Sequence, residues 1–246
     1  MAEQTKSPTA PDATNLISHS ASYYFLQSLN ELNIEYLFCN FGTDHAPLIE
    51  ELAKFKSKGM KAPKVIICPH ENVAIHMAGG FAQITGRGQA VLVHVDSGTA
   101  NAALGMHNLF RNRVPVMLIA GAAPFTSRGE LTGSRDTYVH FIQQPFDQAS
   151  LVRPYVKWEY TLPSGVIAPE VLRRAHSMMQ SEPKGPIYLM LPREVLTDHW
   201  PEQAVHHYSG DQYGSMEMGG ADPEIIDALA KRILASSNPC LITSHG

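Results

Sequence analysis

The sequence predicts an α/β protein built on a parallel sheet of about six strands, with helices on both faces. Apolar runs of strand length alternate along the chain with segments of helix length. The runs are apolar at nearly every position, which is typical of strands that are covered by helices on both sides. The alternation itself favours parallel connections. The predicted strands of this sheet are residues 35–39, 64–68, 90–95, 115–120 and 186–191.

Helices are predicted between these strands. Residues 18–32 repeat Tyr23, Leu26, Leu29 and Leu32 near helical spacing. The segment 222–235 carries a proline in its first turn, a position that tolerates the missing N–H group. The remaining predicted helices are residues 71–85, 99–111, 168–180 and a segment that contains Leu48 and Leu52.

Changes in composition predict four parts of the chain. Residues 1–16 are polar and are expected to form a disordered tail, and residues 17–196 form the main domain. Residues 197–221 are rich in Gly, His and Gln without periodicity and are expected to be a linker. Residues 222–246 predict one helix and one strand (239–243), which cannot bury a core of their own. They are expected to be the truncated start of a further domain.

Composition excludes several classes of partner. The 246 residues are 44% hydrophobic and 17% charged, and 19 basic against 23 acidic residues give a net charge of −4. Without a basic excess, binding to nucleic acid is not expected. The longest apolar runs fall short of the ~20 residues that a membrane span needs. Three cysteines without a CxxC pair and 12 scattered histidines argue against disulfides and metal sites, and favour a cytoplasmic location.

Polar residues and glycines follow four of the predicted strands. The carboxyl ends of parallel strands meet at one edge of a sheet, where α/β proteins place their sites. For any single residue, such as Asp96, Ser97 or Thr99, capping of the next helix is the simpler explanation. For the set together, a functional site is favoured. The four segments are residues 40–45, 69–72, 96–101 and 121–124.

Glu71 is the first residue of a predicted helix whose following side chains are mostly apolar and small. On local sequence alone, an acid that complements the helix dipole is favoured over a carboxyl tuned for proton transfer. His70-Glu71 is not an HExxH zinc motif, because the next histidine, His76, lies on a different face of the helix. Asp96-Ser97-Gly98 also lacks the flanking glycines of a hydrolase GxSxG elbow.

One long segment resembles a known family. Residues 70–121 read HENVAIHMAGGFAQITGRGQAVLVHVDSGTANAALGMHNLFRNRVPVMLIAG, and LPREV follows the strand near residue 190. This resembles the pattern HE-x-x-A-x-x-M-A-x-G-x-A-x-x-T-G, strand, G-x-x-N, helix, P-V-x-x-I-x-G of thiamine diphosphate enzymes of the acetolactate synthase, pyruvate oxidase and 2-oxoacid decarboxylase superfamily. The similarity covers residues 17–196, the family's pyrimidine-binding domain, and residues 222–246 resemble the opening of its central domain.

The resemblance implies roles for particular residues. The family's matching glutamate, here Glu71, hydrogen-bonds the cofactor's pyrimidine and promotes the proton transfer that activates its thiazolium carbon. Gly98 and Asn101 match the cofactor-binding G-x-x-N. Thr43, Asp44 and His45 are implied to face the substrate, although Asp44 could equally cap the following helix. Gln144 matches an active-site Gln of the synthases, although it could equally lie in solvent.

Departures from the family pattern limit the implied function. Asp96-Ser97-Gly98 stands where acetolactate synthases read GPG, which argues against a true acetolactate synthase. No GDG…N sequence for magnesium and diphosphate occurs in these residues. The resemblance therefore implies thiamine diphosphate as cofactor, with Mg²⁺ bound by a domain outside this sequence. It also implies a site shared in a homodimer, or in a hetero-oligomer with a chain that carries the diphosphate domain.

Two main hypotheses follow. The first is the N-terminal part of a C–C bond lyase or carboligase acting on 2-oxoacids or related 2-hydroxyacyl compounds, incomplete without a diphosphate-binding domain and inactive alone. The second is a catalytically inactive remnant that acts as a binding or regulatory subunit. A hydrolase that uses Ser97 is a remote third.

Overall fold

The computed structural model describes residues 17–135 and 143–242 of the chain, and its centre is a six-stranded sheet in which all neighbouring strands are parallel. The predicted fold class is confirmed. In spatial order the strands are β3 (Lys64–Ile67), β2 (Tyr36–Cys39), β4 (Gln89–Val93), β5 (Val116–Ala122), β7 (Ile187–Pro192) and β6 (Glu159–Thr161).

The edge strand β6 completes the sheet and was not predicted. Its three residues include a charged one and are only partly buried, so they show no apolar run. The strand forms because Tyr160 pairs with Leu189 of β7, a contact between residues far apart in the chain. The predicted strand 239–243 does not form over residues 239–242, and Thr243 lies outside the described residues.

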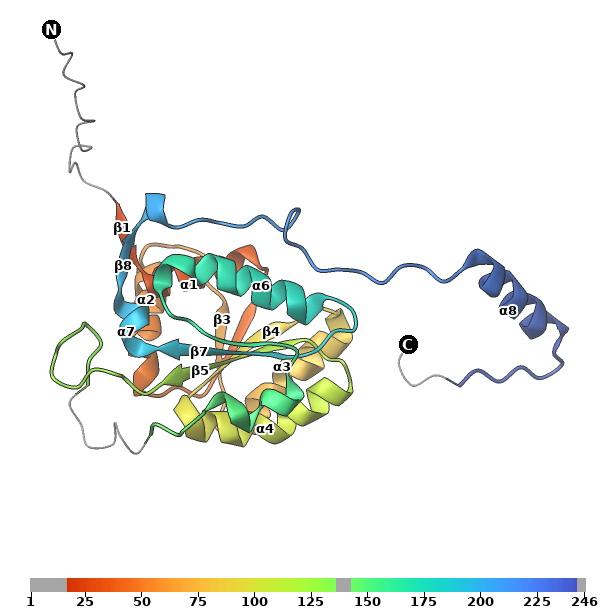
Figure 1. Ribbon diagram of the computed structural model, residues 1–246, viewed down its shortest axis with the longest axis horizontal. Coiled ribbons are helices and arrows are strands. Elements are labelled where there is room, and N and C mark those ends of the chain that lie inside the picture. Colours follow the sequence, from red (N-terminus) through yellow and green to blue (C-terminus); the bar gives the residue numbers. More distant parts are fainter. Residues whose placement is uncertain (1–16, 136–142, 243–246) are drawn as a thin grey trace, which may run out of the picture.

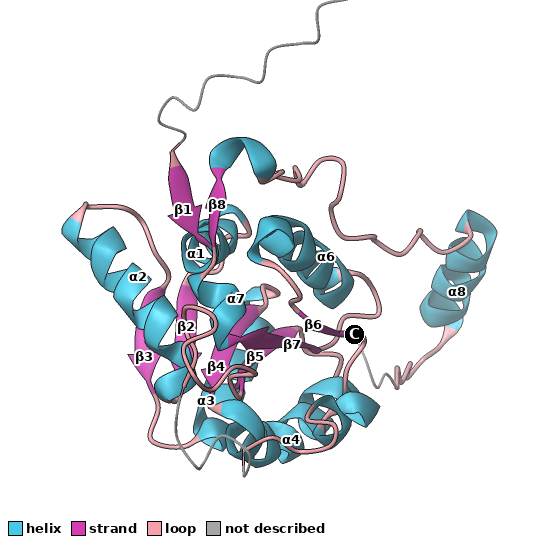
Figure 2. Cartoon of the chain, turned by 60° about the vertical axis from the view of Figure 1, so that its left-hand side comes forward, coloured by secondary structure: helices cyan, strands magenta, loops and turns pink. Residues whose placement is uncertain are grey.

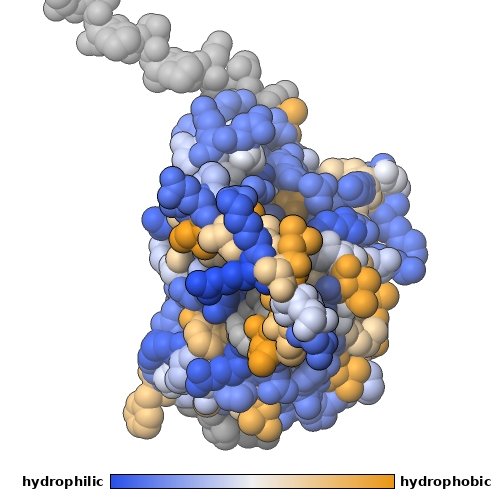
Figure 3. Space-filling model, turned by 90° about the vertical axis from the view of Figure 1, so that its right-hand side faces the viewer, coloured by the Kyte–Doolittle hydropathy of each residue, from blue (hydrophilic) through white to orange (hydrophobic). Residues whose placement is uncertain are grey.

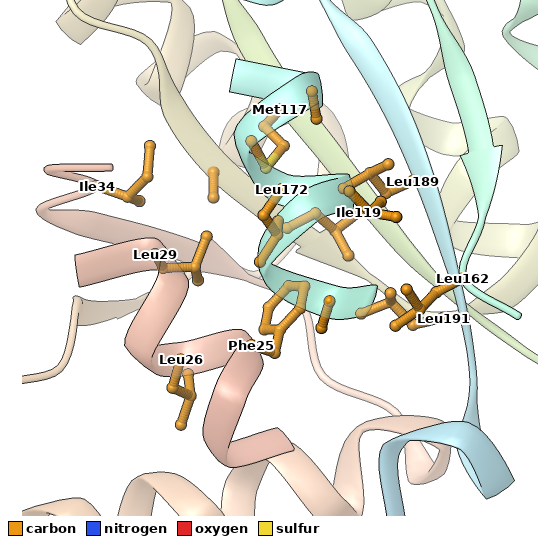
Figure 4. Close-up of a cluster of buried hydrophobic side chains, with 14 of the residues drawn as sticks. Phe25, Leu26, Leu29, Ile34, Met117, Ile119, Leu162, Leu172, Leu189 and Leu191 are labelled. Atoms are coloured by element: carbon orange, nitrogen blue, oxygen red, sulfur yellow. The ribbon is translucent and has the colours of Figure 1, made fainter. Parts of the chain in front are cut away.

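Helices cover both faces of the sheet, as Figure 1 shows. On one face, α1 (Ala21–Glu31), α2 (Ala46–Ser57) and α6 (Ala168–Gln180) enclose a core with the inward side chains of β5 and β7. Figure 4 shows how Phe25 and Leu29 of α1 approach Leu172 of α6 within this core. On the other face, α3 (Glu71–Thr85) packs beside α4 (Val95–Arg111). The sheet is therefore buried on both sides, which explains its continuously apolar strands.

Local signals set the ends of α3 and α6. The His70 side chain accepts a hydrogen bond from the backbone N–H of Asn72 at 3.1 Å, and Gly86 ends α3 with a φ of +72°. That backbone conformation favours glycine. Pro169 lies in the first turn of α6. Both helices have the predicted bounds.

The β4–α4 junction differs from the prediction. The strand ends at Val93 and the helix already begins at Val95, whereas the sequence predicted a strand to residue 95 and a helix from 99. Val95 has a φ of +33°, which is strained for a β-branched residue. An apolar residue that would suit the strand is thus part of the first helical turn, and His94 lies at the turn between the two elements.

The first part of the predicted linker is folded. The chain passes from α7 (Arg193–Thr197) into β8 (His199–Pro201), which pairs antiparallel with β1 (Ser18–Ser20) in a separate two-stranded sheet. Figure 2 shows this pair at the N-terminal end of the described chain. Three-residue strands are too short to give a periodic pattern, so the sequence predicted a helix from residue 18 and a linker from residue 197.

The helix α8 (Pro223–Ala235) lies apart from the sheet in both ribbon views (Figures 1 and 2) and buries no side chain. Its apolar residues, among them Ile226 and Leu234, are exposed. The side of the molecule that carries α8 shows apolar surface among polar side chains (Figure 3). The predicted tail, residues 1–16, falls outside the described residues. Within the described chain, no helix combines the length and the apolar character required to span a membrane.

Candidate functional site

The strand ends form two clusters at the carboxyl edge of the sheet, and both contact α4. Glu71, Gly98 and Asn101 form the first, which we call the Glu71 cluster. Asp44 and His94 form the second, the Asp44–His94 dyad. The dyad contacts α4 at Val95, and the Glu71 cluster includes Gly98 and Asn101 of the same helix, about 4.5 Å and 9 Å of helix rise further along.

Glu71 is the first residue of α3 and is only 8% exposed. Its Oε2 atom accepts a hydrogen bond from the Asn101 side-chain amide at 3.0 Å. The His70 imidazole lies 3.9 Å from the same oxygen. The carboxyl is therefore held in one orientation by a neutral donor on the neighbouring helix.

Gly98 leaves space beside the other oxygen of Glu71. A Cβ atom at this position would lie 2.9 Å from Val93 Cβ and 3.4 Å from Glu71 Oε1. Within residues 17–135 and 143–242, no hydrogen bond reaches Oε1. One oxygen of the carboxyl is thus fixed and the other is open to a ligand.

The dyad is formed by the loop after β2 and the end of β4. Asp44, in the short 3-10 helix η1 (Thr43–His45), is 2% exposed, and its Oδ1 atom lies 2.6 Å from His94 Nδ1. A carboxylate can only accept, so Nδ1 carries the proton. Asp44 Oδ2 accepts from the Val95 backbone N–H at 3.3 Å. Asp44 therefore binds the first residue of α4, and it does not cap α2, whose N-cap residue is His45.

Hydrogen bonding and burial shift the pKa values of this group. Burial opposes ionisation of Asp44, but the hydrogen bond from His94 and the charges of the two imidazoles hold its pKa below the usual value. The same hydrogen bond raises the pKa of His94. Burial lowers the pKa of His45, whose Nδ1 accepts from the Gly42 N–H at 3.0 Å. The dyad is therefore an ion pair in the interval between the ordinary pKa values of an aspartate and a histidine, 3.8 and 6.5.

Two further polar side chains reach the dyad region. Arg135 donates from Nη1 to the Thr43 hydroxyl, and the Gln143 side-chain amide lies 3.3 Å from His94 Nε2. The predicted Gln144 is exposed, and its neighbour Gln143 makes the contact. Sequence reasoning missed His94, Arg135 and Gln143. The only available signal was a histidine at the end of an otherwise apolar run.

A buried hydrogen-bond network supports the same edge. The Gln148 amide donates to the Gly121 carbonyl and to the Tyr188 hydroxyl, each at 2.9 Å. The Thr99 hydroxyl lies 3.1 Å from the Tyr188 hydroxyl. Burial raises the pKa of Tyr188 to about 12, so the phenol stays protonated. This network links α4, β5 and β7 beneath the dyad.

The described residues contain no group of three or more His, Cys, Asp or Glu side chains with a geometry suited to a metal ion. The Glu71 cluster offers a buried carboxyl, and the dyad offers a carboxylate–imidazole pair.

Comparison with known proteins assigns the chain to a family. A family model described as thiamine pyrophosphate enzyme, N-terminal TPP binding domain, matches residues 19–151. The acetolactate synthase large subunit of Lactococcus lactis subsp. lactis is 26% identical over 227 residues, which cover 92% of this chain and 36% of that protein. Benzoylformate decarboxylase of Pseudomonas aeruginosa is also 26% identical over 227 residues, covering 91% of this chain and 38% of its own length. The acetolactate synthase isozyme 3 large subunit of Escherichia coli is 29% identical over 143 residues, 56% of this chain and 23% of that protein.

The chain spans little more than a third of the length of the first two relatives. The matched residues 19–151 include both the Glu71 cluster and the Asp44–His94 dyad, and they make up over half of the chain. On this match and on the six-stranded parallel sheet, the chain belongs to the thiamine pyrophosphate enzyme family and contains its N-terminal TPP-binding domain.

Proposed function

We propose that the chain supplies the pyrimidine-binding half of the active site in a thiamine diphosphate-dependent enzyme that cleaves or joins C–C bonds of 2-oxoacids or related 2-hydroxyacyl compounds. Its relatives include proteins named as a synthase and as a decarboxylase, and both align with more than nine-tenths of the chain. The proposal is therefore limited to the reaction class that a synthase and a decarboxylase of this kind share.

The arrangement of Glu71 carries the proposal. Asn101 holds one carboxyl oxygen, and Gly98 leaves room beside the other, so Oε1 can bond a ring nitrogen of the cofactor's pyrimidine. A carboxyl that is largely withdrawn from water can share a proton with a weakly basic heterocycle. When bound, the cofactor supplies the electron sink. The chain's own contribution is to hold and move a proton at Glu71 Oε1, with Asn101 fixing the orientation of the carboxyl.

The proposal places the diphosphate and Mg²⁺ against residues of another chain or of another part of the protein. Large apolar side chains are exposed on the face formed by α3 and α4, where a partner could cover them. This face, which we call the α3–α4 face, suits a homodimer or a hetero-oligomer with a chain that carries the diphosphate domain. Its exposed apolar residues are Val73, Met77 and Leu104.

Calorimetric titration with thiamine diphosphate and Mg²⁺ tests the proposal. The chain is titrated alone and as a mixture with a partner that carries the diphosphate-binding domain. We expect tight binding only in the mixture, and turnover of 2-oxoacids by the mixture. The variant Glu71→Gln should lose this turnover, whereas Glu50→Gln, at an exposed position of α2, should keep it.

Two outcomes would contradict the proposal. Unchanged turnover in Glu71→Gln would remove the assigned role of the carboxyl. Absence of heat both alone and in the mixture would favour a catalytically inactive binding or regulatory subunit that retains the fold.

A further inference from the structure

Helix capping alone does not explain the contacts of the Asp44–His94 dyad. Asp44 is almost fully buried, yet its carboxylate contacts both the imidazole of His94 and the backbone of Val95. A buried carboxylate is costly unless it is paired and hydrogen-bonded, and the imidazole supplies that pairing. The side chain of His94 remains 24% exposed. The dyad therefore presents one face of a charged imidazole at the sheet edge.

The open atom of this imidazole is Nε2. Because Nδ1 donates to Asp44, Nε2 of the imidazolium carries the second proton and can donate outward. Its neighbour is the side-chain amide of Gln143, at 3.3 Å from Nε2. In the imidazolium form the amide oxygen accepts the hydrogen bond from that proton, since the amide's two ends are assigned from their partners, and a carboxylate that binds His94 takes the place of this oxygen. This leaves the amide nitrogen of Gln143 as a further donor beside His94.

The charged groups around His94 leave positive charge at this edge. Arg135 binds the neutral hydroxyl of Thr43, and no carboxylate of the described residues forms an ion pair with it. Asp44 balances the charge of His94, and the negative charge of Asp96 also raises the pKa of His94. His45 lies with its ring centroid 6.4 Å from that of His94, and burial favours its neutral form. The charge of the Arg135 guanidinium acts to lower the pKa of His94, so the two cationic groups lie near each other at this edge, and both are partly exposed.

We propose that His94 and Arg135 bind the carboxylate of the substrate, with Asp44 as the positioning residue that holds His94 in its charged, outward-donating form. The inference rests on the proposed function and adds to it the residues that recognise an anionic substrate. A guanidinium and an imidazolium N–H are strong donors to a carboxylate. The Glu71 cluster and this carboxylate site contact different positions of α4, so cofactor activation and substrate recognition are separate tasks on one helix.

Histidine-selective NMR on the chain alone tests the inference without the assembled enzyme. Chain labelled with ¹⁵N-histidine is titrated over pH, first free and then with pyruvate. We expect His94 to titrate above the ordinary histidine value, and pyruvate to shift its Nε2 resonance and raise its pKa further. Methyl pyruvate, which lacks the negative charge, should leave His94 unchanged. Inorganic phosphate is the control for a general attraction of anions.

Variants separate the contributions of Arg135 and Asp44 to the binding of pyruvate. Arg135→Gln should weaken the response to pyruvate about ten-fold, as expected for loss of one charge-assisted hydrogen bond, while the chain stays folded. Arg113→Gln, at an exposed turn after α4, is the matched control and should bind as the unmodified chain does. Asp44→Asn should lower the pKa of His94 and abolish the response. Asp44→Glu, which retains the charge, should restore part of both.

Several results would overturn the inference. These are an unperturbed His94 at saturating pyruvate, an equal response to methyl pyruvate, or an equal response to phosphate. They are distinguishable from failure of the proposed function, because cofactor binding in the mixture is measured separately by calorimetry. A mixture that binds cofactor and turns over 2-oxoacids, combined with a silent His94, would overturn the carboxylate site alone.

Discussion

Gly121 of β5 lies directly against the carboxylate of Asp44: a Cβ atom at position 121 would lie 1.6 Å from Oδ2. Gly42 has the same relationship to His94, since a Cβ atom there would lie 2.0 Å from Nδ1. Neither glycine has a φ in the left-handed region. Their role is therefore to provide space, and the two ends of the dyad fit only because the loop after β2 and the strand β5 both lack a side chain at these positions.

The substitution Gly121→Ala should displace Asp44 and destabilise the chain by about 1–3 kcal/mol, because the added methyl group overlaps a buried side chain. Urea denaturation at pH 7 measures this change. Gly80→Ala is the matched control, since a Cβ atom at Gly80 of α3 meets nothing within 4 Å. That variant should be as stable as the unmodified chain or more stable. Equal stabilities for the two variants would contradict the crowding of Asp44 by Gly121.

The contribution of Asp44 to stability should depend on pH. The lowered pKa of Asp44 means that its stabilisation is present above the unfolded value of 3.8 and is lost as the pH falls through the folded pKa. The raised pKa of His94 means that its stabilisation is complete below 6.5 and is lost as the pH rises through the folded pKa. Burial lowers the pKa of His45, so this residue reduces the stability of the folded chain below pH 6.5. The reduction is larger when the negative charge of Asp44 is absent, because that charge raises the pKa of His45.

We therefore expect the free energy of unfolding of Asp44→Asn to fall furthest below that of the unmodified chain between pH 3.8 and 6.5. Above the folded pKa of His94, the difference in free energy of unfolding between the two proteins should become smaller. It should not vanish, because Asp44 of the unmodified chain still accepts the hydrogen bond from the Val95 N–H. Chemical denaturation at a series of pH values measures it. Asp211→Asn, at an exposed loop position, is the control and should show a small, flat difference. A flat profile for Asp44→Asn would show that the dyad is not an ion pair.

The Tyr188 hydroxyl should stabilise the sheet edge through its bonds to Gln148 and Thr99. We expect Tyr188→Phe to lower the free energy of unfolding by about 1–2 kcal/mol, since a buried amide donor loses one partner. Thermal denaturation followed by circular dichroism provides the measurement. Tyr213→Phe, whose residue is 49% exposed, should change it little. If both variants unfold alike, the network contributes nothing measurable.

The α3–α4 face should mediate association with the partner. Leu104 of α4 is 77% exposed, and Leu104→Asp should weaken association about ten-fold or more by placing a charge in an apolar interface. Sedimentation velocity of the chain alone and of the mixture measures this. Ile49→Asp adds the same charge on α2, at a side chain that is 40% exposed on the opposite face of the sheet. Weakening by Ile49→Asp but not by Leu104→Asp would place the interface on that other face.

Elements defined by neighbouring residues could be predicted from the sequence. The bounds of α3 follow from the His70 cap and the left-handed Gly86, and those of α6 from its proline-containing first turn. The parallel sheet follows from buried, apolar strands such as β4 and β5. Glu71 and Asn101 were named together only through the resemblance to a family, because a first-turn acid alone favours a structural role.

Elements that depend on distant residues could not be predicted in this way. The strands β6, β1 and β8 exist through pairing with partners far along the chain, and three residues carry too little pattern to show it. The Asp44–His94 dyad joins the end of β2 to the end of β4, 50 residues apart, in space left by a glycine of β5. Periodicity and capping act over a few residues, so they were sufficient to predict the layers of the fold and the edge where its site lies. Which polar groups meet at that edge depends on where three strands end in space, and no local pattern carries that information.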